Sequence, residues 1–320
     1  MLSPNTQLTL LLTAPLIAGS AESSDILTAG EYAKLRRLLA QFDLEPSNLL
    51  DSSILPADVK TVTETDRYEQ LLKREVQLTQ AIEHWESCGI WVAGQTDDHY
   101  PARFIELMKH HAPPIVYGCG NPELLNTGGL AVVGSRDVDP ELVEFTENVG
   151  RLAALAKRTL ISGGARGIDQ ASMRGAAESN GKVVGVLADS LERAAVNHGN
   201  QELLLDGKLT FITVFDPSAG FNVGHAMQRN RLIYALSDAA LVVNSDVGKG
   251  GTWTGAIEQL DKLHFVPVYV RSTGQESEGL KALQGKGALC WPNPTTPEDL
   301  LEVLARRIEP EHEMKQLSFL

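Results

Sequence analysis

The sequence predicts an α/β protein built on a mostly parallel, doubly wound sheet, and three observations predict it. From Leu130 onward, short apolar runs alternate with helical segments, which is the order of elements in such sheets. The apolar runs lack the two-residue alternation of half-exposed strands, so both faces of the sheet should be covered. Glycine-rich segments follow several of these runs, at the strand ends where open α/β sheets bind ligands.

The first strand–helix–strand unit is expected over residues 130–169. Its first strand, Leu130–Val133, is followed by Asp139-Pro140-Glu141, which places a polar cap, a proline and an acid at the start of a helix. That helix should present an apolar face made by Leu142, Phe145, Val149, Leu152 and Leu155. A second strand, Thr159–Ile161, leads into the glycine-rich segment Ser162–Asp169.

The remaining elements of the main domain follow the same alternation. Further strands are expected at Val183–Leu187, Leu209–Phe215, Ala240–Val243 and Phe265–Val270, with helices between them at Gln170–Ser179, Asn200–Leu205, Ala226–Leu236 and Trp253–Leu263. A last helix is expected from Pro297 to about Arg307. Its Leu301, Val303 and Leu304 either pack back on the sheet or join a dimer.

Four segments with different organisation are predicted along the chain. They are a small helical (SAM-like) domain at residues 1–60, a helical linker and lead-in at 61–118, the main domain at 119–296 and a C-terminal helix and tail at 297–320. In the first segment, helices are expected at Thr6–Leu12, Leu27–Phe42 and Pro46–Leu50, and Thr28 and Glu31 have capping-box spacing. A polar linker is expected at Ser52–Thr65, followed by helices at Asp66–Cys88 and Arg103–His110 and an extended piece at Pro113–Gly118.

Charge and cysteine usage narrow the class of protein. A net charge of −13 argues against non-specific coating of DNA by the whole surface, although it leaves room for a local basic patch. Cys88, Cys119 and Cys290 are odd in number and far apart, so we expect neither a disulfide framework nor a metal site. We expect instead that the protein lies in a reducing compartment, the cytoplasm. Leu8–Ala18 is apolar, but no basic residue precedes it and Pro15 interrupts it, so no secretory signal is expected. No apolar run approaches the ~20 residues of a membrane span.

Four segments carry candidate ligand-binding residues, three of them after expected strands and one on an expected helix. Gly163–Gly167 offers backbone amides at a helix start and a cation, Arg166, so it either binds an anion or is glycine-rich for turn geometry alone. Gly134-Ser135-Arg136 places a second cation at the ligand edge, unless Arg136 forms a surface ion pair with Asp137 or Asp139.

The other two segments lie later in the chain. Lys249–Thr252 again follows a strand and opens a helix, and the adjacent Trp253 either stacks on a base or packs in the core. Arg229-Asn230-Arg231 lies on a helix, where the three side chains cannot all face one way, so one arginine should reach solvent or a ligand.

The sequence carries no clear signature of catalysis. Ser162 does not stand in the GxSxG pattern of a nucleophile elbow, and His225 is interpreted as a structural hydrogen-bonding residue. Asp169 is interpreted as a helix cap that orients Arg166, and Glu258 as structural. We therefore expect no enzyme activity, no cofactor and no metal.

Taken together and in this order, the four loops resemble those of the DprA/Smf family of bacterial DNA-processing proteins. The matching residues are Val133–Arg136, Ser162–Asp169, Arg229–Arg231 and Gly250–Thr254, with a fitting lead-in from Gly89 to Gly120. The resemblance implies an extended Rossmann-like fold, binding of single-stranded DNA, a homodimer and assistance in loading RecA recombinase, without membrane association. The implied DNA- and phosphate-binding residues are Gly134, Ser135, Arg136, Ser162, Gly163, Gly164, Arg166, Gly167, Arg229, Asn230, Arg231, Lys249, Gly250, Gly251 and Thr252.

Departures from the family pattern indicate a divergent branch. Ala171-Ser172 and Ala226-Met227 replace residues usual in the family, and no C-terminal winged-helix domain is expected after the main domain. Two other functions remain open. One is a sensor of a nucleotide or nucleotide-derived ligand, of the kind that would act in defence against phage. The other is a LOG-type phosphoribohydrolase, because Gly250–Glu258 partly matches the sequence signature of those enzymes.

Overall fold

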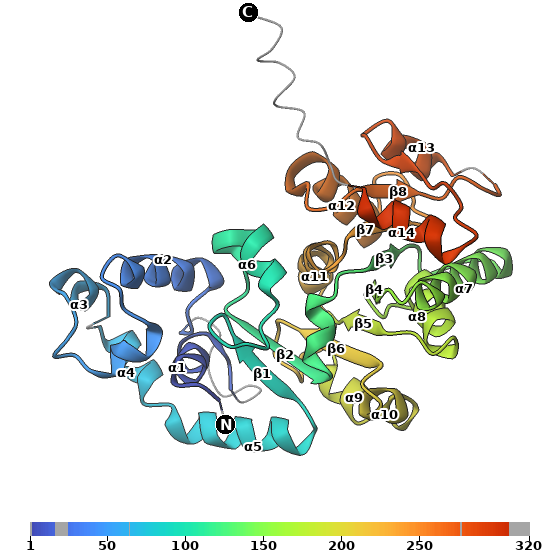
Figure 1. The fold of residues 1–320 in the computed structure, drawn as a ribbon. Helices are drawn as coiled ribbons and strands as arrows, with labels where there is room; N and C mark the ends of the chain where they lie inside the picture. The colour runs from blue at the N-terminus through green and yellow to red at the C-terminus, as the bar shows by residue number, and fades with distance from the viewer. Residues whose placement is uncertain (1, 17–24, 64, 276, 307–320) are drawn as a thin grey trace, which may run out of the picture. The chain divides into compact units, whose positions relative to one another are not determined.

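The computed structural model describes residues 2–16, 25–63, 65–275 and 277–306, and the chain divides into two compact units (Figure 1). The first unit comprises Met1–Asn126 and Val184–Arg229, and the second comprises Thr127–Val183 and Asn230–Leu320, each within its described residues. The predicted four-segment organisation of the chain stays a prediction. None of the described helices is both long and apolar enough to cross a bilayer.

The second unit holds a parallel sheet. Strand β3 (Leu130–Val133) pairs with β4 (Leu160–Ser162) on one side and with β7 (Ala239–Val242) on the other, and β7 pairs with β8 (Val268–Val270). Each residue of these four strands is buried, as the missing alternation predicted. The short β9 (Leu289–Cys290), which the sequence did not indicate, extends the sheet in parallel beside β8.

Helices cover both faces of this sheet because its crossovers run outward from β3 and β7 in opposite directions. Helix α7 (Pro140–Leu155) connects β3 to β4 and packs along α8 (Ile168–Glu178), whereas α12 (Gly250–Glu258) and the π-helical turn η4 (Gln259–Leu263) connect β7 to β8 (Figure 1). Asp139 accepts a hydrogen bond from Leu142 N at 2.8 Å, which confirms the predicted cap of α7.

The predicted apolar face of α7 was wrong in part. Leu155 is 60% exposed, and the buried positions are Thr146, Val149, Gly150 and Ala153. The reason is the close approach of α8. A Cβ at Gly150 would overlap Ser172 O, and one at Gly175 would overlap Glu147 O. The two helices therefore meet backbone to backbone through small residues, which a hydrophobic pattern does not reveal.

The C-terminal part of the second unit adds α13 (Glu278–Gln284), which was not predicted, and α14 (Pro297–Ala305). Helix α14 contacts α7 and buries Leu300, Val303 and Leu304, while Leu301 is 43% exposed. Two of the three residues considered for packing or a dimer thus pack within the unit. Arg307, where the last helix was predicted to end, lies outside the described residues.

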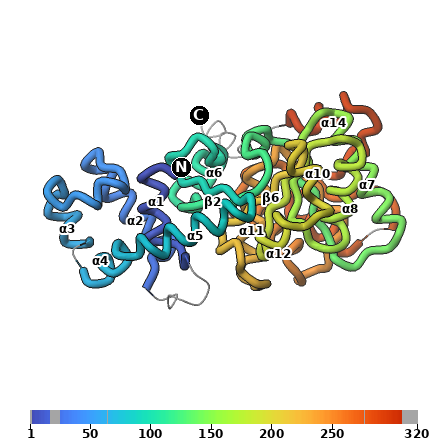
Figure 2. The backbone as a smooth tube through the Cα atoms, turned by 90° about the horizontal axis from the view of Figure 1, so that it is seen from below, coloured from blue at the N-terminus to red at the C-terminus, as the bar shows by residue number. Residues whose placement is uncertain are grey.

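The first unit begins with five α-helices, coloured blue to teal in Figure 2. They are α1 (Pro4–Thr13), α2 (Ala29–Ala40), α3 (Ala57–Thr63), α4 (Asp66–Leu72) and α5 (Glu75–Ser87), with the 3₁₀ turn η1 (Pro46–Leu50) before α3. The linker predicted at Ser52–Thr65 was wrong, because it contains α3. Val59 of that helix is fully buried, and this burial stabilises a short helix whose sequence pattern is weak.

The single helix predicted over Asp66–Cys88 was also wrong, because it breaks between α4 and α5 at Lys73-Arg74. The Arg74 guanidinium donates hydrogen bonds to Leu11 O at 3.3 Å and Ala14 O at 2.5 Å. It thereby satisfies carbonyl groups at the C-terminal end of α1, where a helix leaves its last carbonyls without partners. The break is therefore a tertiary effect centred on one arginine.

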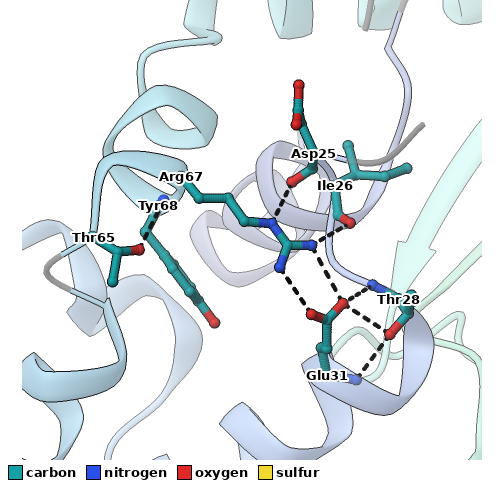
Figure 3. A network of polar contacts seen from close by, with 7 residues as sticks. All are labelled: Asp25, Ile26, Thr28, Glu31, Thr65, Arg67 and Tyr68. Atoms are coloured by element: carbon teal, nitrogen blue, oxygen red, sulfur yellow. Dashed lines mark hydrogen bonds and ion pairs between the residues drawn. The ribbon is translucent and has the colours of Figure 1, made fainter. Parts of the chain in front are cut away.

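A polar network ties α4 to the start of α2 (Figure 3). Thr28 and Glu31 form the predicted capping box of α2, and Arg67 Nη1 donates to Glu31 Oε1 at 2.8 Å. Arg67 also donates to Asp25 O at 2.8 Å and to Ile26 O at 2.7 Å. The hydrogen bonds from Arg67 and Thr28 lower the pKa of Glu31 to about 2.

The rest of the first unit is a strand layer with helices. Strand β2 (Ile115–Gly120) pairs antiparallel with β1 (Trp91–Gly94) and with β6 (Leu209–Thr213), which lies beside β5 (Val183–Val186). The connecting helices are α6 (Ala102–Met108), η2 (Lys109–His111), η3 (Pro122–Asn126), α9 (Leu191–Ala195) and α10 (His198–Leu205). Helix α11 (Val223–Leu236) starts in this unit and ends in the second.

Candidate functional site

Three loops of the second unit meet at one edge of its parallel sheet. Gly134–Arg136 follows β3, Gly163–Gly167 follows β4, and Lys249–Thr252 comprises the N-cap residue and the first residues of α12, the helix that follows β7. Ile168 N donates to Ser135 O at 3.2 Å, and Thr252 Oγ1 donates to Gly134 O at 2.9 Å. The structure thus brings together segments that the sequence placed up to 118 residues apart. We call these three loops the glycine cradle.

Glycine is required where the first two loops of the cradle touch. Gly167 has a φ of +88°, and a Cβ at this position would overlap Ser135 O. A Cβ at Gly134 would lie 2.5 Å from Ile168 Cγ1, well inside contact distance. Packing therefore explains these two glycines without any ligand, and it also leaves their backbone close to the surface of the cradle.

The buried side chain of Asn230 on α11 supports the third loop of the cradle. Asn230 Nδ2 donates to Gly251 O at 2.8 Å, and Thr254 Oγ1 donates to Gly250 O at 3.1 Å. Asn230 is only 8% exposed, and a Cβ at Gly255 would lie 2.8 Å from its Nδ2. These contacts hold the start of α12 in place, and the N–H groups of its first turn have no partner within the helix.

Cations stand at the surface of the cradle. Arg136, Arg166 and Lys249 are all exposed. Among the described residues, Arg166 and Lys249 form no ion pair and no side-chain hydrogen bond. Two helix starts, those of α8 and α12, also open here, and each carries the positive end of a helix dipole. This combination of amides, dipoles and cations suits an anionic group such as phosphate.

Four of the predicted site residues lie beneath the surface. Ser162 is fully buried, and its hydroxyl donates to Val132 O at 2.6 Å, which links β4 to β3. Gly163 is buried beside it. On α11, Arg229 is 6% exposed and Asn230 is 8% exposed. The exposed or half-buried members are Gly134, Ser135, Arg136, Gly164, Arg166, Gly167, Arg231, Lys249, Gly250, Gly251 and Thr252.

Arg231 is engaged in an ion pair with Glu258 of α12. Arg231 Nε donates to Glu258 Oε2 at 2.8 Å, and Arg231 Nη2 donates to Glu258 Oε1 at 2.6 Å. This hydrogen bonding raises the pKa of Arg231 above its ordinary value. Glu258 is thus bound to a cation, in agreement with its interpretation as a structural residue.

The interpretation of Asp169 needs a correction. Helix α8 begins at Ile168, so its N-cap position is Gly167, and Asp169 lies in the first turn. The buried Asp169 carboxylate accepts a long hydrogen bond from Ala165 N at 3.4 Å, so it braces the loop of the cradle from inside. In the first unit, His225 stacks on Phe215 with ring centroids 3.8 Å apart, and in the second unit Trp253 is half-buried.

Sequence reasoning missed Arg271, which follows β8 at the same edge of the sheet. Arg271 is 8% exposed, and Nε donates to Val243 O at 3.0 Å, at the start of the loop that leads to Lys249. Its Nη groups donate to Thr273 O and Gln275 O, and burial lowers its pKa. An arginine directly after an apolar strand was the available signal. Arg271 therefore supports the third loop of the cradle from the neighbouring strand.

Comparison with known proteins places the chain in a family. A sequence profile of the family described as DNA recombination-mediator protein A matches residues 91–305. Protein Smf of Escherichia coli is 31% identical over 218 residues, which cover 65% of this chain and 54% of Smf. The DNA processing protein DprA of Bacillus subtilis is 23% identical over 282 residues, which cover 84% of this chain and 90% of that protein. The chain thus spans about half the length of Smf and most of the Bacillus protein.

Solved structures confirm the predicted Rossmann-like α/β fold. DprA from Streptococcus pneumoniae matches with a TM-score of 0.62 and 21% identity over 86% of this chain and 98% of that chain. DNA processing protein A from Helicobacter pylori, whose structure concerns its single-stranded DNA binding mode, matches with a TM-score of 0.54 and 22% identity over 67% of this chain and 95% of that chain. The profile match over residues 91–305 covers most of the sequence, and the chain therefore belongs to the DNA recombination-mediator protein A family.

Proposed function

We propose that this protein binds single-stranded DNA through the glycine cradle and acts in DNA uptake, recombination or DNA protection. The observation that carries the proposal is the convergence of three strand-end loops, two helix starts and the exposed cations Arg166 and Lys249 at one edge of a parallel sheet. Phosphates are the part of a nucleic acid that amides, helix dipoles and cations recognise without regard to sequence.

Family membership supports the same proposal. The Helicobacter pylori relative of this fold is described by its binding of single-stranded DNA, and the family description names recombination. By the same reasoning we propose that the protein forms a homodimer, assists RecA loading and works in the cytoplasm without catalysing a reaction. The net charge of −13 would confine the bound strand to the cradle, since the rest of the surface repels phosphates.

A small nucleotide-derived ligand is the second candidate for the cradle. The exposed carboxylates of Asp137, Asp139 and Asp246 lie in the loops that carry Arg136 and Lys249, and they favour a compact anion over a long polyanion. A phosphoribohydrolase is less well supported, because Glu258 is held by Arg231 in a bidentate ion pair. A sensor would bind a mononucleotide tightly and DNA poorly.

The test compares binding of a fluorescent single strand of about 20 nucleotides with binding of adenosine monophosphate. Wild type, Arg166→Ala, Lys249→Ala and the control Arg151→Ala would be titrated at low salt. Arg151 lies 11 residues beyond Pro140 on α7, or about 16 Å along the helix away from the cradle. We expect the first two variants to bind the strand at least several-fold more weakly and Arg151→Ala to bind like wild type. Tight binding of the mononucleotide without binding of DNA would overturn the proposal.

A further inference from the structure

The ion pair of Arg231 and Glu258 lies on two helices that also form the cradle. Asn230, next to Arg231 on α11, contacts Gly251 and Gly255 of α12, so this part of α11 packs along α12 from its first turn onward. Glu258 lies eight residues after Gly250, or about 12 Å along α12. Its ion pair therefore places the cation of Arg231 about 12 Å along α12 from the cradle.

Arg231 is accessible to solvent, but the carboxylate of Glu258 neutralises its charge. The side chains of Arg231 and Glu258 are 44% and 20% exposed. Glu258 takes one N–H from Nε and one from Nη2, at 2.8 Å and 2.6 Å, and the guanidinium has three further N–H groups. A phosphate could still reach those N–H groups. It would, however, meet a carboxylate at nearly the same distance, and the attraction and the repulsion largely cancel.

We infer that Glu258 is an affinity-setting residue that restrains the binding of single-stranded DNA by neutralising Arg231. This inference rests on the proposed function of the cradle. A strand whose phosphates lie at Gly250 and Gly251 and that continues along α12 reaches Arg231 together with Glu258, so this cation contributes little to counterion release. Removal of the carboxylate adds one effective phosphate contact, which is worth about 0.7 in the slope of log affinity against log salt for a single strand.

The opposite role would be that of a positioning residue. A carboxylate bound side-on to an arginine fixes the plane of the guanidinium and can orient it towards a phosphate. In that case loss of Glu258 would weaken binding. The two roles predict opposite signs for the same substitution, so one experiment separates them.

The experiment measures affinity for a single strand of about 20 nucleotides from about 50 mM to about 200 mM salt for wild type, Glu258→Gln, Arg231→Ala and the double variant. We expect Glu258→Gln to bind more tightly, with an advantage that falls about threefold across this range because of the added contact. In the Arg231→Ala background the same substitution should give a smaller gain. Glu302→Gln, which removes an exposed carboxylate from α14, should leave affinity unchanged.

Each outcome has a defined meaning. Unchanged or weaker binding by Glu258→Gln, with wild type binding the strand, would overturn the inference and leave the proposed function intact. An equal gain in both arginine backgrounds would also overturn it, because Glu258 would then act as any surface carboxylate. No binding by wild type or by Glu258→Gln at about 50 mM salt would sink the proposed function and this inference with it. Melting temperatures of all variants would confirm that each one is folded.

Discussion

Asn230 donates a hydrogen bond to the carbonyl oxygen of Gly251 across 2.8 Å, and this contact fixes the third loop of the glycine cradle to α11. The middle residue of the Arg229-Asn230-Arg231 segment thus supports the cradle, while the arginines on either side differ. Arg229 is 6% exposed, and Arg231 pairs with Glu258 on the surface. The segment therefore combines a supporting residue with a surface cation.

Asn230→Ala should weaken binding of single-stranded DNA without changing its salt dependence. The substitution removes the support of Gly251 but no charge, so the loop loses its conformation and the number of ion contacts stays the same. Loss of a buried hydrogen bond should also lower the free energy of unfolding by about 1–3 kcal/mol. Asn148→Ala on the exposed face of α7 is the matched control for urea unfolding and for DNA titration. A changed salt slope would argue against a purely supporting role.

Gly167→Ala should destabilise the protein far more than Gly248→Ala. Both glycines have positive φ, +88° and +69°, so an alanine would be strained at either position, and at Gly167 the ψ of −127° adds to the strain. Only at Gly167 would the new Cβ overlap Ser135 O, whereas nothing lies within 4 Å of the Cβ position at Gly248. We expect about 1 kcal/mol of destabilisation at Gly248 and clearly more at Gly167 in chemical denaturation. Equal losses would contradict the close contact between the first two loops.

Ser162→Ala should lower stability and leave DNA affinity unchanged. The buried hydroxyl of Ser162 donates to Val132 O and does not reach the surface of the cradle. Removing one buried hydrogen bond should reduce the free energy of unfolding by about 1 kcal/mol. If the variant kept normal stability but lost DNA binding, Ser162 would instead be a residue that contacts the DNA.

Glu31→Gln should reduce stability in a manner that depends on pH. Contact with Arg67 and Thr28 holds the folded pKa of Glu31 at about 2, below the ordinary value of 4.5. A depressed folded pKa stabilises the folded state above the unfolded pKa, and that stabilisation is lost as pH falls from about 4.5 towards about 2. The side chains of Arg67 and Glu31 are 36% and 41% exposed, so solvent screening keeps the effect to about 1 kcal/mol or less.

The measurement is the difference in the free energy of unfolding between wild type and Glu31→Gln by urea at neutral pH and at acid pH. The difference should shrink as the solution is acidified through the window between the two pKa values. A difference that is constant with pH would show that the network in Figure 3 does not depend on the charge of Glu31.

Local signals predicted the elements of the sheet well. The strand Leu130–Val133 and the cap at Asp139 agree with the structure because apolar runs and capping residues act within a few positions. The rule that ligands bind at the carboxyl ends of parallel strands was sufficient to anticipate that the loops of the cradle lie at one edge. Family resemblance added the order of these loops.

Long-range contacts account for the errors. The break at Arg74 depends on the carbonyls of α1, some 60 residues away, and the buried face of α7 depends on Gly175 of α8. The supporting roles of Asn230 and Arg271 likewise depend on carbonyl groups of other segments. The sequence of one segment does not indicate which distant carbonyl group a side chain will contact, so these contacts could be identified only in the structure.

The most direct test of the account is the salt dependence of single-stranded DNA binding by wild type and by the Arg166→Ala/Lys249→Ala double variant. If the cradle holds phosphates, the affinity of wild type falls steeply with salt, and the double variant binds more weakly with a slope smaller by about 1.4, or about 0.7 for each lost contact. Equal slopes for the two proteins, or no binding of DNA by wild type at low salt, would contradict the account.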